Sequence, residues 1–302
     1  MLVAFAAVYL IWGSTYLAIR VAIETMPPML MAGARFLVAG MLLFAIARRP
    51  GARRERLTWP HWRAALIIGG CLLFTGNGGV TWGEQFVASG LVALIVATVP
   101  LWVTVFGPLF GTQRAGKLQV AGIAVGLAGV ALLLRPGGSV SWQATLVVGS
   151  SMVWAIGSLY ARRAPAPSSG LTAVGMEMLA GGALLGIAGL ASGEIGRVHV
   201  DRVSVSSIIA FAYLILVGAI VGYGAYIWLL HHVPPSAAAT YAFVNPLVAV
   251  ALGALILAEP ITTITLIAGA LIVVAVAIIL VAQGRSSALR EAAPHAPVSE
   301  VA

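Results

Sequence analysis

Two ionisable residues lie inside long apolar stretches of the chain, where a charge is costly to bury. Arg35 and Glu177 are 142 positions apart, and a charged side chain in the core of a bilayer costs at least about 2.5–3.5 kcal/mol on insertion scales. Such residues usually line a pathway for ions, protons or polar solutes, or they pair with one another. We expect Arg35 and Glu177 to gate a pathway, to bind solute charge or to carry a proton. The alternative is a fixed polar clamp between helices.

Aromatic and small polar residues occur along the same stretches. Aromatic faces with a few placed polar groups suit small organic solutes, including cations, which the ring quadrupole attracts. Two other roles stay open, because Trp and Tyr also favour membrane interfaces and polar side chains often bond to neighbouring helices. The residues that we expect to contact a solute are Trp12, Ser14, Thr15, Tyr16, Asn77, Trp102, Trp154, Ser158, Tyr223, Tyr241 and Asn245.

Pro100 and Pro246 also fall inside apolar stretches. Proline removes a backbone hydrogen bond from a helix, so these positions predict helix hinges, with a static kink as the alternative.

Signatures of catalysis and of metal or cofactor binding are missing. There is no His-Glu-x-x-His, and Asp201 is the only aspartate, so no aspartate pair exists. A complete phosphate-binding loop ending in Lys-Ser or Lys-Thr is absent, which argues against a nucleotide-driven pump. We expect no enzyme activity, no metal and no cofactor. The alternative is a polytopic membrane enzyme, or a channel, without a recognisable catalytic motif.

The composition indicates a membrane protein. Of 302 residues, 61% are hydrophobic and 9% are charged, whereas a soluble domain carries about 25% charged residues. These charges are too few to cover a water-facing surface, so most of the exterior must face lipid. The net charge of +8 does not indicate a nucleic-acid partner, because most Lys and Arg residues lie in short gaps between apolar runs, where they set membrane topology.

Ten apolar runs approach the length of about 20 residues that a spanning helix needs. They cover residues 2–21, 29–48, 64–83, 88–111, 118–135, 143–161, 171–191, 207–230, 237–258 and 262–282. With the N-terminus inside, twelve Lys and Arg residues fall on the cytoplasmic side and four outside. This asymmetry predicts cytoplasmic N- and C-termini. Residues 283–302 are rich in Ala, Ser, Pro and charge and predict a disordered cytoplasmic tail.

The two halves of the chain resemble each other. Shifts of 142 and 146 positions align Trp12 with Trp154, Gly33 with Gly175, Trp82 with Trp228, and Pro100 with Pro246. Each half contains five apolar runs, and an odd number inserts the second copy upside down. Inverted repeats around a site near mid-membrane are a recurrent transporter architecture. The prediction is an all-α membrane protein of ten transmembrane helices, built as two inverted five-helix repeats (residues 3–135 and 143–282) around a central cavity.

Several short motifs, in this order, resemble those of the EamA-type drug/metabolite transporter superfamily. They are Trp12-Gly13-Ser14-Thr15-Tyr16, Arg35-Phe36, Tyr241 with Asn245-Pro246-Leu247, and Glu259-Pro260. The resemblance covers about residues 3 to 282 as two EamA repeats and is closest to bacterial inner-membrane exporters. It implies a ten-helix basket whose cavity is lined mostly by helices one, three, four, six, eight and nine. One departure is Gln113, which stands in the first repeat where the second has Glu259.

The resemblance implies export of small metabolites, amino acids or drugs across the bacterial inner membrane. Together with the repeat it predicts a secondary transporter that works by alternating access and is driven by an ion gradient or by the gradient of the solute. The expected partners are a small-molecule substrate and the lipid bilayer. The spacing of Gly122-x-x-x-Gly126 and Gly182-x-x-x-Gly186 permits close helix packing and leaves a homodimer open.

Overall fold

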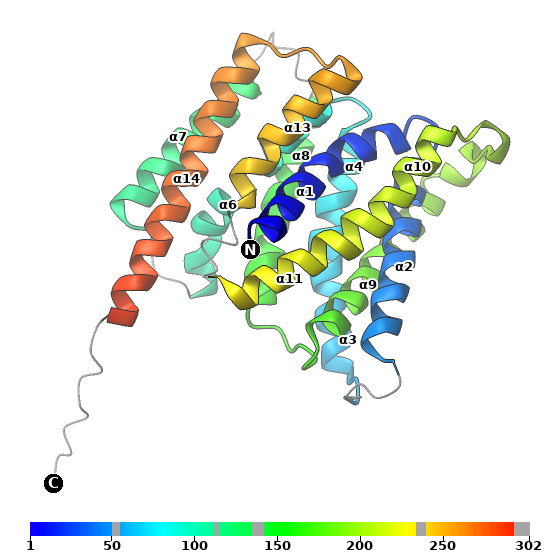
Figure 1. The fold of residues 1–302 in the computed structure, drawn as a ribbon, viewed down its shortest axis with the longest axis horizontal. Coiled ribbons are helices and arrows are strands. Elements are labelled where there is room, and N and C mark those ends of the chain that lie inside the picture. Colours follow the sequence, from blue (N-terminus) through cyan, green and yellow to red (C-terminus); the bar gives the residue numbers. More distant parts are fainter. Residues whose placement is uncertain (50–54, 112–114, 135–141, 234–239, 293–302) are drawn as a thin grey trace.

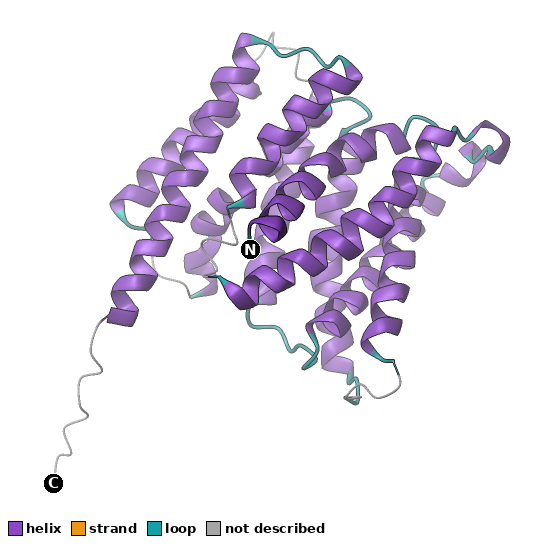
Figure 2. Cartoon of the chain, in the orientation of Figure 1, coloured by secondary structure: helices purple, strands orange, loops and turns teal. Residues whose placement is uncertain are grey.

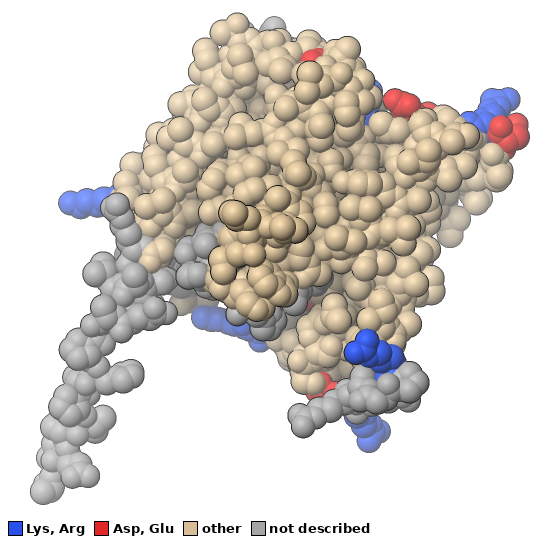
Figure 3. All heavy atoms as spheres, viewed as in Figure 1, with Lys and Arg blue, Asp and Glu red and all other residues tan. Residues whose placement is uncertain are grey.

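The computed structural model describes residues 1–49, 55–111, 115–134, 142–233 and 240–292. Within these ranges every regular element is a helix, and the helices lie side by side in a bundle with loops at its two ends (Figures 1 and 2). Charged side chains project from loops and helix ends, and the middle of the visible face is uncharged (Figure 3). This distribution fits a protein whose central belt faces lipid.

Eight helical segments of the described chain are long and apolar enough to cross a membrane, and two further apolar helices are shorter. The long segments are α1 (Leu2–Ala22), α2 (Pro28–Ala47), α3-η1-α4 (Trp59–Gly83), α5-α6-η2 (Ser89–Phe110), α8 (Trp142–Ala161), α9 (Gly170–Ala191), α10-η5-α11 (Val205–His232, with Val205–Tyr226 as the span) and α14 (Thr263–Ala292, with Thr263–Gly284 as the span). The shorter ones are α7 (Lys117–Leu133) and α13 (Tyr241–Leu257). The protein is therefore an all-helical, multi-pass membrane protein.

The observed helices differ from the predicted runs mainly at their ends. The third segment begins at Trp59 instead of 64, because Thr58 and His61 form a reciprocal capping box at its start. Helix α14 continues to Ala292, beyond the predicted end at 282, so the first part of the predicted tail is helical. Residues 293–302 of that tail lie outside the described residues.

The third and eighth apolar runs share an unusual local structure. Residues Gly70–Asn77 of the third run form the π-helix η1, and Leu214–Val221 of the eighth form the π-helix η5. The two begin 144 positions apart, close to the spacing of the repeat seen in the sequence. Because π-helical turns are rare and frequently mark functional sites, their duplication is structural evidence for the repeat.

The two halves of the chain pack against each other through matched helix pairs. Helix α2 lies along α9, and α7 lies along α14 (Figure 1). Helix α1, the first of the first repeat, packs on α13 of the second repeat. The repeat-related pair is α8, the first helix of the second repeat, with α5 of the first repeat. The interface between the halves therefore runs through most of the bundle. The glycine motifs serve this interface, since Gly182 faces Leu37 of α2, and Gly122 and Gly126 face Ala275 of α14.

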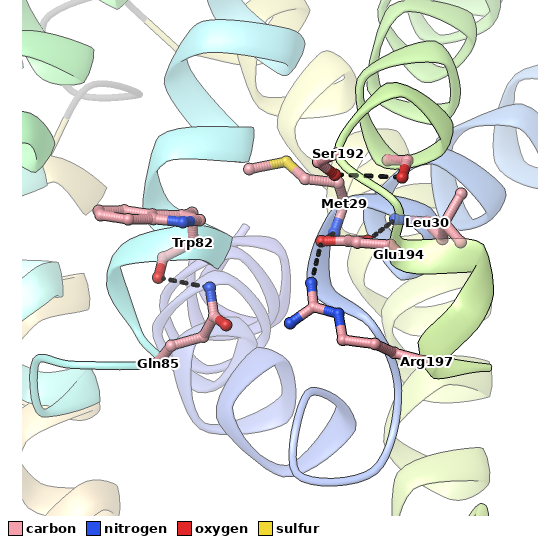
Figure 4. A network of polar contacts seen from close by, with 8 residues as sticks. Met29, Leu30, Trp82, Gln85, Ser192, Glu194 and Arg197 are labelled. Atoms are coloured by element: carbon pink, nitrogen blue, oxygen red, sulfur yellow. Dashed lines mark hydrogen bonds and ion pairs between the residues drawn. The ribbon is translucent and has the colours of Figure 1, made fainter. Parts of the chain in front are cut away.

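Two glutamates cap helix starts of the opposite repeat. Glu194 accepts hydrogen bonds from the amides of Met29 (3.2 Å) and Leu30 (2.9 Å) at the start of α2, and it pairs with Arg197 at 3.3 Å (Figure 4). Its counterpart Glu55 accepts from the amide of Ser168 at 2.6 Å, just before α9. The two glutamates are 139 positions apart, and so are their partner residues Met29 and Ser168, so the two contacts are related by the repeat. A carboxylate at a helix N-terminus is stabilised by the helix dipole, and the bonds from Ser168 lower the pKa of Glu55.

We expect Glu194→Ala to destabilise the protein by about 1–3 kcal/mol, because two amides lose a charged acceptor. Arg197→Ala is the matched control: its side chain is 59% exposed, and exposed ion pairs contribute at most about 1 kcal/mol. Thermal unfolding in detergent measures both. Equal melting temperatures for Glu194→Ala and the wild type would show that the cap is energetically neutral.

Candidate functional site

An aromatic cluster joins the two repeats. Trp12 of α1 meets Tyr241 of α13 edge-on, with ring centroids 4.9 Å apart, and Tyr226 of α11 at 5.1 Å. Tyr226 and Tyr241 are 5.6 Å apart, and the Trp12 Nε1 group donates to the carbonyl of Gly218 in η5 at 3.3 Å. Two of the predicted solute contacts, Trp12 and Tyr241, are thus brought together. The cluster depends on helices from both halves of the chain.

The predicted polar residues on α1 already have protein partners. Ser14 Oγ donates to the carbonyl of Ile11 and shares a 2.6 Å hydrogen bond with the hydroxyl of Tyr213. Thr15 Oγ1 donates to the carbonyl of Trp12 at 2.7 Å. Ser14 therefore connects α1 to α10, which fits the alternative role of tying helices together.

Asn245 ties α13 to α1. Its side chain is 8% exposed, and its amide nitrogen is placed to donate to the carbonyls of Tyr9 (3.3 Å) and Tyr241 (3.2 Å). The Tyr9 hydroxyl bonds Thr240 Oγ1 at 2.5 Å. These bonds hold the helix that carries Tyr241 against the helix that carries Trp12, so Asn245 positions the aromatic cluster.

Trp154 and Trp102 make contacts outside this cluster. Trp154 of α8 packs against Gly76 of η1, where an added Cβ would stand 2.7 Å from its ring. Ser158 donates to the carbonyl of Trp154 at 2.9 Å. Trp102 donates to Thr98 Oγ1 at 3.0 Å and stacks on Phe106. The side chain of Tyr223 lies outside the described residues.

The two predicted prolines differ in their effect. Helix α5 ends at Val96 and α6 begins at Val99, so the helix is interrupted just before Pro100. Pro246 lies inside the continuous helix α13. The break supports a hinge at Pro100, whereas at Pro246 the structure shows an unbroken helix.

Arg35 is buried with unused hydrogen-bonding capacity. Its side chain is 6% exposed, and Nη2 donates to Asn77 Oδ1 at 3.1 Å. Nε and Nη1 have no hydrogen-bond partner among the described residues. Because a guanidinium has five N–H donors, Arg35 can still bind an acceptor group. The predicted residues Arg35 and Asn77 thus act as a pair.

Glu84 is a buried acid that the sequence reasoning missed. It follows α4 (Gly78–Gly83) and precedes α5 (Ser89–Val96), and its side chain is fully buried. Neither carboxylate oxygen has a hydrogen-bond partner in the described chain, although Arg20 Nη1 donates to its backbone carbonyl. Glu84 interacts electrostatically with Arg20, Arg35 and Tyr16. The signal available in the sequence is an acid directly after the apolar run 64–83.

We call Tyr16, Arg20, Arg35, Asn77 and Glu84 the Arg35–Glu84 cluster. Its members come from α1, α2, η1 and the turn after α4, all in the first repeat. It brings together three predicted residues, Tyr16, Arg35 and Asn77, and adds Arg20 and Glu84.

Glu177 lies in a different environment from Arg35. Partly buried on α9, it lines a pocket with His61 of α3, Met176, and Ala161 and Pro165 at the end of α8. This pocket lies where α3 and α9 begin. A direct Arg35–Glu177 ion pair is not among those in the described part of the chain. The two residues are therefore not a directly bonded clamp.

Glu259 has a structural role between the repeats. Its carboxylate accepts hydrogen bonds from the amides of Ser89 (2.7 Å) and Gly90 (3.2 Å) and from Ser89 Oγ (3.0 Å). It therefore caps α5 in the first repeat from the loop after α13. Gln113, its counterpart by sequence, lies outside the described residues.

A bundle of apolar helices in two matched halves, with buried charges among them, defines a multi-pass membrane transporter. The sequence pattern of the EamA-like transporter family matches residues 1–135 and 141–281. The chain belongs to this family and is a membrane transporter of small molecules. The two matched segments have nearly the bounds of the predicted repeats.

Similar proteins carry transporter names. The inner membrane transporter YedA of Escherichia coli K12 is 44% identical over 280 residues, covering 91% of this chain and 89% of the relative. A probable amino-acid metabolite efflux pump of Salmonella typhimurium is 26% identical, covering 89% and 90%. One crystal structure has a TM-score of 0.63 at 21% identity and covers 93% and 98% of the two chains. At this identity the structural likeness concerns the fold alone.

Proposed function

We propose that this transporter exports small metabolites, amino acids or drugs across the bacterial inner membrane by alternating access. In this proposal ten helices span the membrane, as two inverted five-helix repeats, and both termini are cytoplasmic. The name of the Escherichia coli relative supports a location in the inner membrane, and the name of the Salmonella relative supports transport out of the cell. The distribution of Lys and Arg supports the orientation.

The observation that carries the proposal is the aromatic cluster at the junction of the repeats. Trp12 comes from the first repeat, and Tyr226 and Tyr241 come from the second. A movement of one repeat against the other must therefore alter the cluster. Aromatic faces bind organic solutes and cations, so a solute held there would be bound or released as the repeats move. This is the behaviour that alternating access requires.

The charged residues have two separate roles in this proposal. Arg35, with unused donors, binds acceptor groups of the solute from one end of the bundle. Glu177, in its pocket at the opposite end, gates access from the cytoplasm. Pro100, at the break between α5 and α6, permits bending of the fourth apolar run.

We expect Trp12→Ala to raise the apparent KM for transport about tenfold, since losing a well-packed aromatic contact costs about 0.5–1.5 kcal/mol beyond its buried area. Trp12→Phe keeps a ring and should retain most of the affinity. Uptake into inside-out vesicles, measured over a range of solute concentrations, separates KM from maximal rate. An unchanged KM for Trp12→Ala would assign Trp12 to helix packing alone.

An untargeted comparison of metabolites in medium and cytosol tests export itself. The cells would overexpress the wild type or Glu177→Ala at matched protein levels. Movement of one class of compound into the medium with the wild type alone supports export and names the substrate class. Unchanged pools across a broad panel would contradict export.

A further inference from the structure

Glu84 combines complete burial with the absence of any hydrogen-bond donor to its carboxylate. It is 0% exposed, and both oxygens lack a partner among the described residues. Thr81, one turn earlier, is equally buried, and its hydroxyl also has no partner. The Arg20 guanidinium lies close enough to bond the Glu84 backbone carbonyl, yet no ion pair to the carboxylate forms in the described chain.

An ionised carboxylate in this position would be strongly unfavourable. Moving an ion out of water costs several kcal/mol even after relaxation, and only a close partner with good geometry offsets this cost. Buried groups of this kind normally neutralise instead. The buried environment of Glu84 therefore favours the neutral carboxylic acid over the ionised carboxylate.

We propose that Glu84 is a proton-binding site that couples closure of this end of the transporter to protonation. When the turn between α4 and α5 is buried, the carboxylate binds one proton from water and becomes a carboxylic acid. When this end opens, the carboxyl group is hydrated and returns the proton to water. The inference rests on the alternating access proposed above and adds a proton to that cycle.

The charged neighbours set the direction of the pH dependence. Glu84 lies between two spanning segments, Trp59–Gly83 and Ser89–Phe110. Burial raises the pKa of Glu84 well above its usual value, the Glu259 carboxylate raises it further, and Arg20 and Arg35 oppose the shift. Tyr16 of α1 also faces Glu84, whereas α5 and α8 carry no charged residue.

The sign follows from these two states. The pKa is higher when this end is closed than when it is open to water, so the proton binds more tightly to the closed form. Closure is favoured most at a pH below the ordinary glutamate pKa of about 4.3. This preference is lost as the pH rises through the raised pKa of the closed form.

Infrared difference spectroscopy of the purified protein tests the proton site with protons as the only ligand. At a pH above the ordinary glutamate range the wild type should show a carboxylic-acid C=O band that Glu84→Gln lacks, with both compared in a Glu177→Gln background because Glu177 is a second, partly buried acid. Glu24→Gln removes an exposed acid that follows α1 and should leave the band in place. A wild type without the band, or Glu84→Gln with it, would overturn the proposal.

Cysteine labelling tests the link to closure. In a Cys71→Ala background, the labelling rate of Thr81→Cys with an impermeant maleimide is divided at each pH by the rate of a reference cysteine at exposed Glu24 (Glu24→Cys), because thiolate formation alone speeds the reaction as pH rises. This normalised rate should be at least tenfold higher at high pH than at low pH. Adding Glu84→Gln, which mimics the neutral acid, should make labelling slow at both pH values. Equal rates at both pH values in the parent would overturn the proposal, with size-exclusion profiles confirming that each variant is folded.

These readouts are independent of the exported solute. Normal export with pH-independent labelling rejects the proton site and leaves the proposed function standing. Absence of export with pH-dependent labelling rejects export and leaves the proton site standing.

Discussion

Replacing Arg35 with Met should reduce transport at least tenfold while the yield and thermal stability of the protein stay the same or rise. The guanidinium is 6% exposed, and Nε and Nη1 have no partner in the described chain. A buried charge that has no ion-pair partner pays its desolvation cost without compensation, so we expect an apolar residue of similar length to be neutral or stabilising. The N–H donors on Nε and Nη1 are available to bind a solute, so their loss should lower the transport rate. Initial rates in vesicles and melting temperatures measure the two effects separately.

Arg35→Lys is the matched control for charge alone. It keeps the positive charge but loses the planar array of donors that also reaches Asn77. We expect intermediate transport, with a raised KM. Wild-type rates in Arg35→Met would show that Arg35 is a structural clamp, and a large drop in melting temperature would show the same.

Gly33→Ala should destabilise the protein by about 1–3 kcal/mol through overpacking. A Cβ at Gly33 would stand 2.8 Å from the backbone nitrogen of Gly186 and 3.1 Å from the carbonyl of Gly182. These are backbone atoms of α9, so the whole helix must move to make room. Helix α2 would separate from α9 along the main contact between the two repeats. The melting temperature in detergent should fall accordingly.

Gly186→Ala tests the same helix pair without the steric conflict. A Cβ at Gly186 meets nothing within 4 Å, and Ala is favoured over Gly inside a helix by up to about 1 kcal/mol. We expect unchanged or slightly raised stability. If both variants melted alike, close packing of α2 on α9 would not be the source of the effect.

The sequence alone was sufficient to predict the helical class and the duplication. Every predicted apolar run overlaps a helix of the described chain, although residue 135 of the fifth run and residues 237–239 of the ninth run are not described. The local rule that proline interrupts helices applied equally to Pro100 and Pro246, yet only the helix at Pro100 is interrupted, and the hinges themselves stay predictions. Inverted topology, the number of spans and cytoplasmic termini stay predictions that await topology mapping.

The pairing of functional residues was decided by the tertiary structure. Trp12 meets Tyr226 and Tyr241 only because α1 packs on α11 and α13. The sequence places Arg35 and Glu177 at equivalent positions of the two repeats. In the structure, Arg35 donates a hydrogen bond to Asn77, whereas Glu177 lines a separate pocket. Glu259 lies between two predicted apolar runs, and only the structure shows that its carboxylate caps a helix of the other repeat.

Glu84 shows the physical reason for this division. The length of an apolar run and the position of a proline depend only on neighbouring residues in the chain. A long apolar run must satisfy its own backbone hydrogen bonds in lipid, so its helical structure can be predicted locally. The protonation state and role of an acid depend instead on burial and on charges brought in by other helices. Glu84 is flanked in the chain by Gly83 and Gln85, while its electrostatic neighbours Tyr16, Arg20 and Arg35 come from α1 and α2. The sequence therefore determined which segments form apolar helices, and only the tertiary structure decided which of the charges are buried together.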